Sequence, residues 1–389
     1  MINEVFIVDA LRTPIGGMRK SLKTVPATEL ASIVIKELVK RNNIKETAID
    51  EGILGNVVST GLGQNPARQA LVRSGLLPEI PAFTVNKVCG SGLKSVILAA
   101  QAIQCGDHNM IIAGGMESAS QCPHFFSGDK KADQLEKDQI SDSLIKDGLW
   151  CSLTDTHMGD IAECTAEKFK ISRQEQDEYA LESHQKAVNA INNNLSQKEI
   201  VPVKVTSKKI FDVDEKPRKN ASLKRLSRLP SVFKPDGSVT AGNSPAPADG
   251  AAAVILASGE AVKENKLKTV ARIIEYASVA VEPNLVFTAP AESIKKSLKK
   301  ASLSLSDIDI FEINEAFAVQ AILTVRNTGL DKRKMNILGG TIALGHPLGA
   351  SGARGLVTLI NALETENKKR GIMSICLGGG CAVSLIVER

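Results

Sequence analysis

Apolar and polar positions follow two alternating patterns over the first 118 residues of the chain. Short apolar runs, which are typical of strands, occupy residues 5–9, 51–58, 83–88 and 110–113. Stretches with helical periodicity lie between them, at residues 28–41, 65–74 and 92–104. The last of these is apolar nearly all round, which indicates a helix buried on every side. This alternation predicts an α/β fold with a mostly parallel sheet covered by helices.

The sequence changes character between residues 119 and 249. Residues 127–147 are polar and charged. A capping box at Ser172 and Glu175 then begins a helix that continues to about residue 191. A basic stretch follows and ends at a Pro-Asp-Gly turn at residues 235–237. We interpret residues 119–249 as an inserted loop domain that covers a site.

The last 120 or so residues repeat the character of the first. In each part a glycine-rich turn precedes an apolar helix of small residues, and a later strand ends in consecutive glycines. The same supersecondary unit therefore occurs twice, which predicts a duplicated fold with a site where the halves meet. We assign residues 1–118 and 250–270 to the N-terminal half and residues 271–389 to the C-terminal half.

Composition excludes several classes of protein. Of the 389 residues, 43% are hydrophobic and 23% are charged, as in a globular protein, and no apolar run approaches the roughly 20 residues of a membrane helix. The N-terminus resembles neither a signal peptide nor a transit peptide, so we expect a cytoplasmic protein. The seven cysteines include no C-x-x-C pair, so we expect neither a disulfide framework nor structural zinc.

The formal net charge of +5 is concentrated in one segment. Residues 204–234 carry ten basic and three acidic side chains, which indicates an anionic partner at one place. A phosphorylated small molecule fits better than nucleic acid, because the flanks lack helix-turn-helix, RNP and zinc-finger patterns. A solvated loop with incidental lysines is the alternative interpretation.

Two residues are placed like a nucleophile and its base. Cys89 follows a strand and immediately precedes the buried helix, where the N–H groups and partial positive charge of a helix N-terminus stabilise a thiolate. His346 lies in a Gly-His-Pro-Leu-Gly turn before the second apolar helix, a rigid position that suits a general base. Taken alone, each residue could equally be a buried apolar cysteine or an ordinary histidine.

Two further candidates lie at predicted strand ends, where ligands bind in open α/β sheets. Cys376 begins a Cys-Leu-Gly-Gly-Gly sequence, whose backbone N–H groups, including that of Gly378, could form an oxyanion hole. Asn314 follows a strand-like run and could orient a water or a carbonyl. The simpler alternatives are a tight turn and a helix cap.

Taken together, these motifs resemble the thiolase family, specifically its acetoacetyl-CoA (biosynthetic) type, nearly end to end. The matching segments are VCGSG around Cys89, AGGMES at 113–118, HMG at 157–159, SRQEQDEYALESHQKA at 172–187, TAGN at 240–243, DGAAAV at 249–254, INEAFA at 313–318, GHPLGASG at 345–352 and CLGGG at 376–380. The resemblance implies duplicated βαβαβαββ halves in a five-layer α-β-α-β-α arrangement, with the inserted loop domain providing coenzyme A binding and oligomer contacts.

The resemblance also implies a ping-pong mechanism. Cys89 would take the acetyl group of acetyl-CoA while His346 accepts the thiol proton, and Cys376 would then deprotonate a second acetyl-CoA to give acetoacetyl-CoA and CoA. One oxyanion hole would use His346 and a water held by Asn314. The other would use the backbone N–H groups of Cys89 and Gly378.

Substrate contacts are implied in the same way. His157 and Met158 match a short-chain subgroup in which this pair covers the acyl end. Coenzyme A contacts fall on Arg218, Leu229, Phe233 and Ala241, and the remaining substrate contacts on Leu149, Ser244, Ala316 and Phe317. The family pattern predicts a homotetramer or dimer with no catalytic metal, no tightly bound cofactor, no nucleic acid and no membrane partner.

The chain departs from the family pattern at four positions. Pro245 replaces a serine near the pantetheine, Val286 replaces a methionine and Phe287 a glycine in the acyl pocket, and Thr341 replaces a smaller residue or an asparagine. These changes leave two alternatives open. One is a 3-ketoacyl-CoA thiolase that acts on longer chains, and the other is a weakly active thiolase-like carrier of acyl-CoA. A decarboxylating ketosynthase is less consistent with Cys376.

Overall fold

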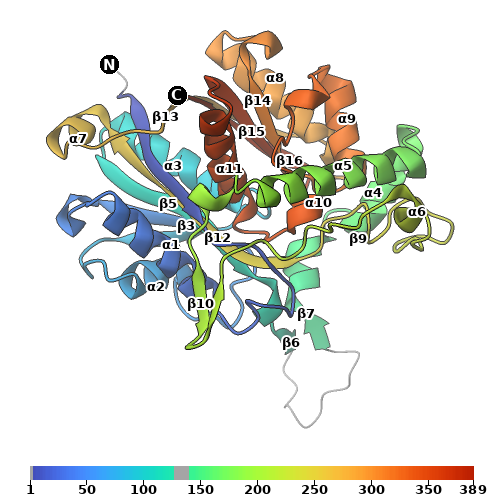
Figure 1. Ribbon diagram of the computed structural model, residues 1–389, viewed down its shortest axis with the longest axis horizontal. Coiled ribbons are helices and arrows are strands. Elements are labelled where there is room, and N and C mark those ends of the chain that lie inside the picture. Colours follow the sequence, from blue (N-terminus) through green and yellow to red (C-terminus); the bar gives the residue numbers. More distant parts are fainter. Residues whose placement is uncertain (1–2, 127–139) are drawn as a thin grey trace.

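The computed structural model describes residues 3–126 and 140–389 (Figure 1). The elements of the N-terminal half are β1 (Val5–Arg12), β2 (Gly16–Gly17), α1 (Ala27–Arg41), β3 (Glu51–Gly55), α2 (Pro66–Arg73), β4 (Ala82–Val85), α3 (Ser91–Cys105), β5 (Met110–Ser118), β12 (Ala248–Ser258) and α7 (Gly259–Glu264). Those of the C-terminal half are β13 (Ala271–Ala280), α8 (Ala289–Ala301), β14 (Ile310–Ile313), α9 (Ala318–Thr328), α10 (Thr341–Leu344), α11 (Ser351–Thr365), β15 (Arg370–Leu377) and β16 (Cys381–Glu388).

Between these halves the chain forms further elements that lie across them. They are β6 (His124–Phe126), β7 (Ile140–Asp142), β8 (Trp150–Cys151), β9 (Thr156–His157), α4 (Met158–Lys168), α5 (Arg173–Asn192), β10 (Val203–Thr206), β11 (Lys209–Phe211) and α6 (Leu223–Leu226). The capping box forms as expected, because the Ser172 side chain accepts a hydrogen bond from the Glu175 N–H and the Glu175 carboxylate accepts one from the Ser172 N–H.

The prediction of a mostly parallel sheet is wrong for the sheet as a whole, although β3, β4 and β5 of the first 118 residues do pair in parallel. The strands follow the order β14-β15-β16-β13-β1-β12-β5-β3-β4, with β2 beside β12, and only the β3–β4, β3–β5 and β14–β15 pairs are parallel. Parallel pairs arise where a helix connects successive strands. β15 and β16 instead form a hairpin through the glycines that follow Cys376, and β12 returns from the inserted segment antiparallel to β5.

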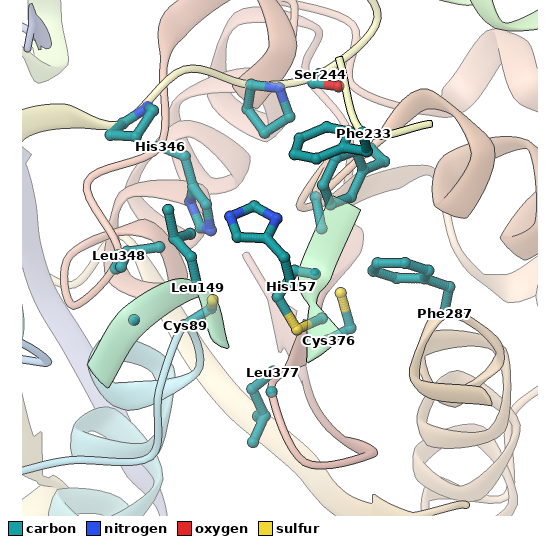
Figure 2. A pocket seen from close by; sticks show the side chains of 17 residues that line it. Cys89, Leu149, His157, Phe233, Ser244, Phe287, His346, Leu348, Cys376 and Leu377 are labelled. Carbon is teal, nitrogen blue, oxygen red and sulfur yellow. The ribbon is translucent and has the colours of Figure 1, made fainter. Parts of the chain in front are cut away.

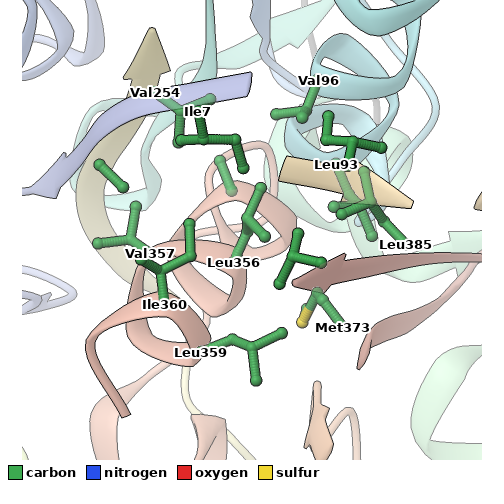
Figure 3. Packing of buried hydrophobic residues seen from close by; sticks show 14 of the residues in the cluster. Ile7, Leu93, Val96, Val254, Leu356, Val357, Leu359, Ile360, Met373 and Leu385 are labelled. Carbon is green, nitrogen blue, oxygen red and sulfur yellow. The ribbon is translucent and has the colours of Figure 1, made fainter. Parts of the chain in front are cut away.

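Helices cover both outer faces of the strands and also fill the space between the halves. α1 and α2 pack on the outside of the N-terminal half, and α8 and α9 on the outside of the C-terminal half. α3 and α11 lie between the two groups of strands (Figure 1). Figure 3 shows Leu356, Val357 and Ile360 of α11 in this central layer, close to Ile7 and Val254. The result is the five-layer arrangement implied by the family resemblance.

α3 is the helix that the apolar pattern predicted to be buried all round. The stretch Val88–Cys105 has a mean hydropathy of 1.2 over 18 residues, enough to resemble a membrane span. In the fold, however, this stretch packs against α11, β5 and β3. The prediction of burial on every side is only partly right, because Lys94, Leu98 and Gln101 on the remaining face of α3 are half-buried. Its hydrophobicity is therefore that of a core helix, and each fully buried leucine or valine contributes roughly 2 kcal/mol to stability.

Glycines allow α3 and α11 to meet at their first turns. A Cβ atom on Gly92 would lie 2.8 Å from the carbonyl oxygen of Gly349, and one on Gly352 would lie 2.6 Å from the Leu93 nitrogen. A Cβ on Gly115 of β5 would also overlap the Gly349 carbonyl. This close approach places the turn that carries His346 beside the turn that carries Cys89.

A buried ion-pair cluster attaches the basic segment to the N-terminal half. Arg12 of β1 pairs with Glu199 at 2.6 Å and with Asp214 at 2.8 Å, and all three side chains are almost fully buried. Asp214 also accepts a hydrogen bond from the Ile15 N–H. Burial alone would lower the pKa of Arg12, but the carboxylates of Asp214 and Glu199 hold it above its usual value. The segment that begins at residue 214 is thereby fixed near the site.

We expect Gly92→Ala to destabilise the protein by about 1–3 kcal/mol, because the new methyl group meets backbone atoms that cannot move independently. Thermal unfolding of the purified variant measures this loss. Gly259→Ala is the matched control, since its Cβ would find only the Phe6 ring at 3.6 Å. Equal melting temperatures for the two variants would contradict the close-contact argument.

Candidate active site

A cavity between the two halves collects most of the residues that the sequence singled out (Figure 2). Its wall includes these predicted residues: Cys89, Leu149, His157, Met158, Phe233, Ser244, Ala316, Phe317, His346, Cys376 and Gly378. The cavity is also lined by Gly148, Pro245, Pro247, Phe287, Leu348 and Leu377. The lining is therefore mainly apolar, with two thiols and two imidazoles as its reactive groups.

Cys89 lies in a strained turn between β4 and α3. Val88, directly before it, has a φ of 47°, a conformation that costs a β-branched residue energy. The Ser91 hydroxyl stabilises the turn by donating to the Val88 carbonyl at 2.6 Å and accepting from the Lys87 N–H at 2.8 Å. Strain maintained in this way fixes the direction in which the Cys89 thiol points.

His346 has one ring nitrogen committed and one available. Its Nδ1 lies 2.6 Å from the Ser351 hydroxyl, which itself donates to the Pro347 carbonyl at 2.9 Å. Because that hydroxyl has only one hydrogen, Nδ1 must be the donor, which leaves Nε2 as an acceptor. Burial, with the charge of Arg354 as a smaller effect, lowers the His346 pKa to about 3. The imidazole is thus a neutral base at physiological pH.

Burial keeps both cavity thiols protonated. It raises the pKa of Cys89 to about 12, and the negative charge of Glu117 adds to this effect. The N–H groups of Cys89 and Gly378 oppose the increase, so these two donors face the sulfur. Burial, together with Cys89, raises the pKa of Cys376 still further. Desolvation therefore outweighs the stabilisation that a helix N-terminus gives a thiolate, so Cys89 rests as a thiol whose proton His346 has to accept.

Glu117, which the sequence did not single out, ties the turn of His346 to the end of β3. One of its carboxylate oxygens accepts from the Gly349 N–H at 2.9 Å, in the turn of His346. The carboxylate also accepts from the Asn56 amide at 2.9 Å and from the Val57 N–H at 3.1 Å. Burial raises the Glu117 pKa to about 7. Within AGGMES, a charged residue among apolar ones was the available signal.

Aromatic side chains close one end of the cavity. Phe287 is fully buried and meets Phe317 edge to face, with centroids 5.4 Å apart, and Phe317 meets Phe233 at 6.3 Å. His157 stacks on Phe233 at 5.0 Å. Phe287, one of the departures from the family pattern, therefore fills space beside Cys376 that a glycine would leave open (Figure 2).

A second cavity carries the positive charge. The predicted residues Arg218, Leu229, Ala241 and Ser244 line it, and Ser244 lines the first cavity too. Lys216, Arg225 and His184 also line it, although the sequence did not single them out individually. His184 Nδ1 accepts from the Arg218 N–H at 3.3 Å, and burial beside these cations lowers its pKa to about 4. Because His184 is neutral, the positive charge of this cavity comes from Lys216, Arg218 and Arg225.

Asn314 lies behind the wall of the cavity. Its side chain is fully buried, and its backbone N–H donates to the Ser374 carbonyl at 2.9 Å. Ala316, two residues further on, lines the cavity. Among the described residues, no acceptor pairs with Nδ2 of Asn314. Residues 3–126 and 140–389 contain no cluster of ligands suited to a metal ion.

Comparison with known proteins gives the family. Residues 5–260 match the thiolase N-terminal domain and residues 267–389 match the thiolase C-terminal domain. The chain belongs to the thiolase family. It is 44% identical to an acetyl-CoA acetyltransferase of Pseudomonas aeruginosa over the full length of both, and 46% identical to one of Escherichia coli over 98% of both.

Solved structures share the whole fold. A crystal structure of Bacillus anthracis acetyl-CoA acetyltransferase superposes with a TM-score of 0.96 at 37% identity, covering 100% of this chain and 99% of that one. Human mitochondrial 3-ketoacyl-CoA thiolase in complex with CoA gives 0.95 at 39% identity, covering 99% and 98%. Proteins with this fold therefore include one named acetyl-CoA acetyltransferase and one named 3-ketoacyl-CoA thiolase, so the fold alone does not distinguish the two activities.

We expect alkylation of Cys89 by iodoacetamide to accelerate about tenfold per pH unit up to pH ~9 without levelling off, because only the thiolate reacts and the pKa lies near 12. Mass spectrometry of the Cys89 peptide gives the rate, and exposed Cys105 serves as an internal reference. A plateau near neutral pH would mean that Cys89 is a resting thiolate.

Proposed function

We propose that this thiolase is an acetyl-CoA C-acetyltransferase, which condenses two acetyl-CoA molecules to acetoacetyl-CoA and CoA and catalyses the reverse thiolysis. The observation that carries the proposal is the apolar cavity in which Cys89, Cys376 and His346 meet, next to a basic cavity that shares Ser244. The first cavity accommodates a short acyl group and the second suits the phosphates of coenzyme A. Acetyl-CoA acetyltransferase is also the name of several full-length relatives.

In the first half-reaction Cys89 attacks the thioester carbonyl of acetyl-CoA. His346 takes the thiol proton on Nε2, which is the free acceptor when Nδ1 donates to Ser351. The new N–H then faces the oxygen on which negative charge develops, together with a water that Asn314 would hold. Collapse of the tetrahedral intermediate breaks the bond to the CoA sulfur and leaves acetyl-Cys89. The departing sulfur takes the proton of the Cys376 thiol, and CoA is released.

In the second half-reaction Cys376 acts as the base. Having given its proton to the departing CoA sulfur, Cys376 is a thiolate, and the raised pKa of this buried group makes it a strong base, able to remove a proton from the methyl group of the second acetyl-CoA. The resulting enolate carbon attacks acetyl-Cys89, and the Cys89 sulfur leaves with the proton that His346 returns to it. The N–H groups of Cys89 and Gly378, which already face the Cys89 sulfur, would then stabilise the second oxyanion.

A longer-chain 3-ketoacyl-CoA thiolase is the competing function, and one structural relative carries that name. The aromatic wall of Phe287, Phe317 and Phe233 favours the short-chain proposal, because it blocks the direction beyond Cys376. The carrier alternative rests on Pro245, which lines the cavity without a donor for the pantetheine. The complete set of reactive groups argues against a carrier.

We further propose a cytoplasmic homo-oligomer, a tetramer or a dimer, that needs no tightly bound cofactor. Strand β4 supports the association, since it is the last strand of the sheet and Phe83 within it is 39% exposed. Unpaired edge strands of this kind are available to pair with another copy. Analytical ultracentrifugation measures the mass of the assembly.

A thiolysis assay with acetoacetyl-CoA and free CoA tests the proposed function. We expect rapid formation of acetyl-CoA by the wild type and a loss of about 10³-fold or more in Cys89→Ser, because a hydroxyl is a far weaker nucleophile than a thiol. Cys105→Ser, at an exposed position, is the control and should retain full activity. Coenzyme A binding without turnover in the wild type would favour the carrier alternative.

We expect Phe287→Val to raise the ratio of activity on 3-ketohexanoyl-CoA to activity on acetoacetyl-CoA by roughly tenfold, since the smaller side chain lengthens the acyl pocket. Phe311→Val is the matched control, because Phe311 is equally buried but lies in a separate core cluster. A similar ratio in both variants would show that Phe287 does not limit chain length.

A further inference from the structure

Thr341 is a departure from the family pattern to which the proposed function gives no role. It is fully buried at the start of α10, and its hydroxyl lies 2.8 Å from Oδ1 of Asn314. The same hydroxyl oxygen is 3.3 Å from the Arg354 guanidinium, which pairs with Glu312 at 2.9 Å. The four side chains form one buried chain of hydrogen bonds that ends on Asn314.

The direction of this chain is fixed by its charged end. A guanidinium only donates, so the Thr341 oxygen accepts from Arg354 and its single hydrogen is left for Asn314. The amide of Asn314 must therefore present its oxygen to Thr341 and its NH2 group to the opposite side. A hydrogen-bond network of this kind is what decides the orientation of an asparagine amide.

The backbone around Thr341 cannot move easily. Glu315, next to Asn314, accepts a hydrogen bond from the Ile342 N–H at 2.9 Å, and from the Tyr179 and Ser183 hydroxyls at 3.0 and 2.8 Å. Asn314 and Glu315, which follow β14, are thus bonded to Thr341 and Ile342, the first two residues of α10. The distance between Thr341 and Asn314 is therefore set by the fold rather than by side-chain freedom.

The other side of the Asn314 amide faces no protein acceptor. Its Nδ2 is buried and unpaired among the described residues, and leaving such a donor unsatisfied is costly. Its backbone is bonded to Ser374, close to Cys376, and Ala316 lines the cavity. An oxygen of a bound water or substrate is the partner that this position would supply.

We propose that Thr341 is a positioning residue that orients the Asn314 amide, so that Nδ2 is directed toward the water of the oxyanion hole that Asn314 would share with His346. This proposal rests on the proposed function, and it adds a role for a residue outside the cavity wall. Thr341 acts only through Asn314, and it contacts neither substrate nor the reacting atoms. A residue without a hydroxyl at this position would leave the amide free to rotate.

Kinetics of Thr341→Val and Thr341→Ser test the proposal in the thiolysis direction. We expect Thr341→Val, which is nearly isosteric, to lower kcat about tenfold with KM within about twofold. Thr341→Ser keeps the hydroxyl and should stay within about twofold of the wild type. In an Asn314→Ala background, Thr341→Val should lower kcat by less than about a further twofold, because the side chain that Thr341 orients is absent. An equal loss in both backgrounds would mean a general structural role and overturn the proposal.

Crystal structures of the same variants provide a measurement that needs no turnover. We expect the Asn314 amide to keep its orientation in Thr341→Ser and to rotate or become disordered in Thr341→Val. An unchanged amide in Thr341→Val would overturn the positioning role, whatever the activity of that variant. Absence of thiolysis by the wild type would instead count against the proposed function, and the amide orientation would still decide the role of Thr341.

Discussion

The site depends on one close contact, the approach of the first turns of α3 and α11. Because Gly92 and Gly352 carry no side chain, the two helices touch backbone to backbone, and Gly115 lets β5 approach the same point. Cys89 precedes one helix and His346 precedes the other, so this contact alone brings a nucleophile and a base together from opposite halves of the fold. The large hydrophobic central layer is closely packed, and it holds the two helices in one fixed position.

Burial then determines how the reactive groups share protons. The same desolvation that raises the pKa of Cys89 to about 12 lowers that of His346 to about 3. The resting site therefore holds a neutral thiol beside a neutral imidazole, and proton transfer has to accompany the attack rather than precede it. A protonated thiol is also protected from adventitious oxidation and alkylation, which react with the thiolate.

Short-range patterns in the sequence predicted which residues line the cavity better than they predicted the sheet. Strand, turn and helix signals around Cys89 and His346 are local, and so is the strand-end signal at Cys376 and Gly378, which line the same cavity. The antiparallel course of β12 was not predictable, because it depends on how the chain returns after more than a hundred inserted residues. Glu117 and Arg354 were missed, because their roles arise from contacts between distant segments.

Two buried carboxylates show why the back of the cavity is rigid. Glu312 neutralises Arg354, and Glu315 collects hydrogen bonds from α5 and α10, so α5 of the inserted segment is fixed to the strand end that carries Asn314. Buried ion pairs are weak contributors to stability, because desolvation offsets their attraction. Their value here is directional: each specifies one arrangement of donors and acceptors. An oxyanion hole needs that property most, since a donor misplaced by about 1 Å loses much of its effect on the transition state.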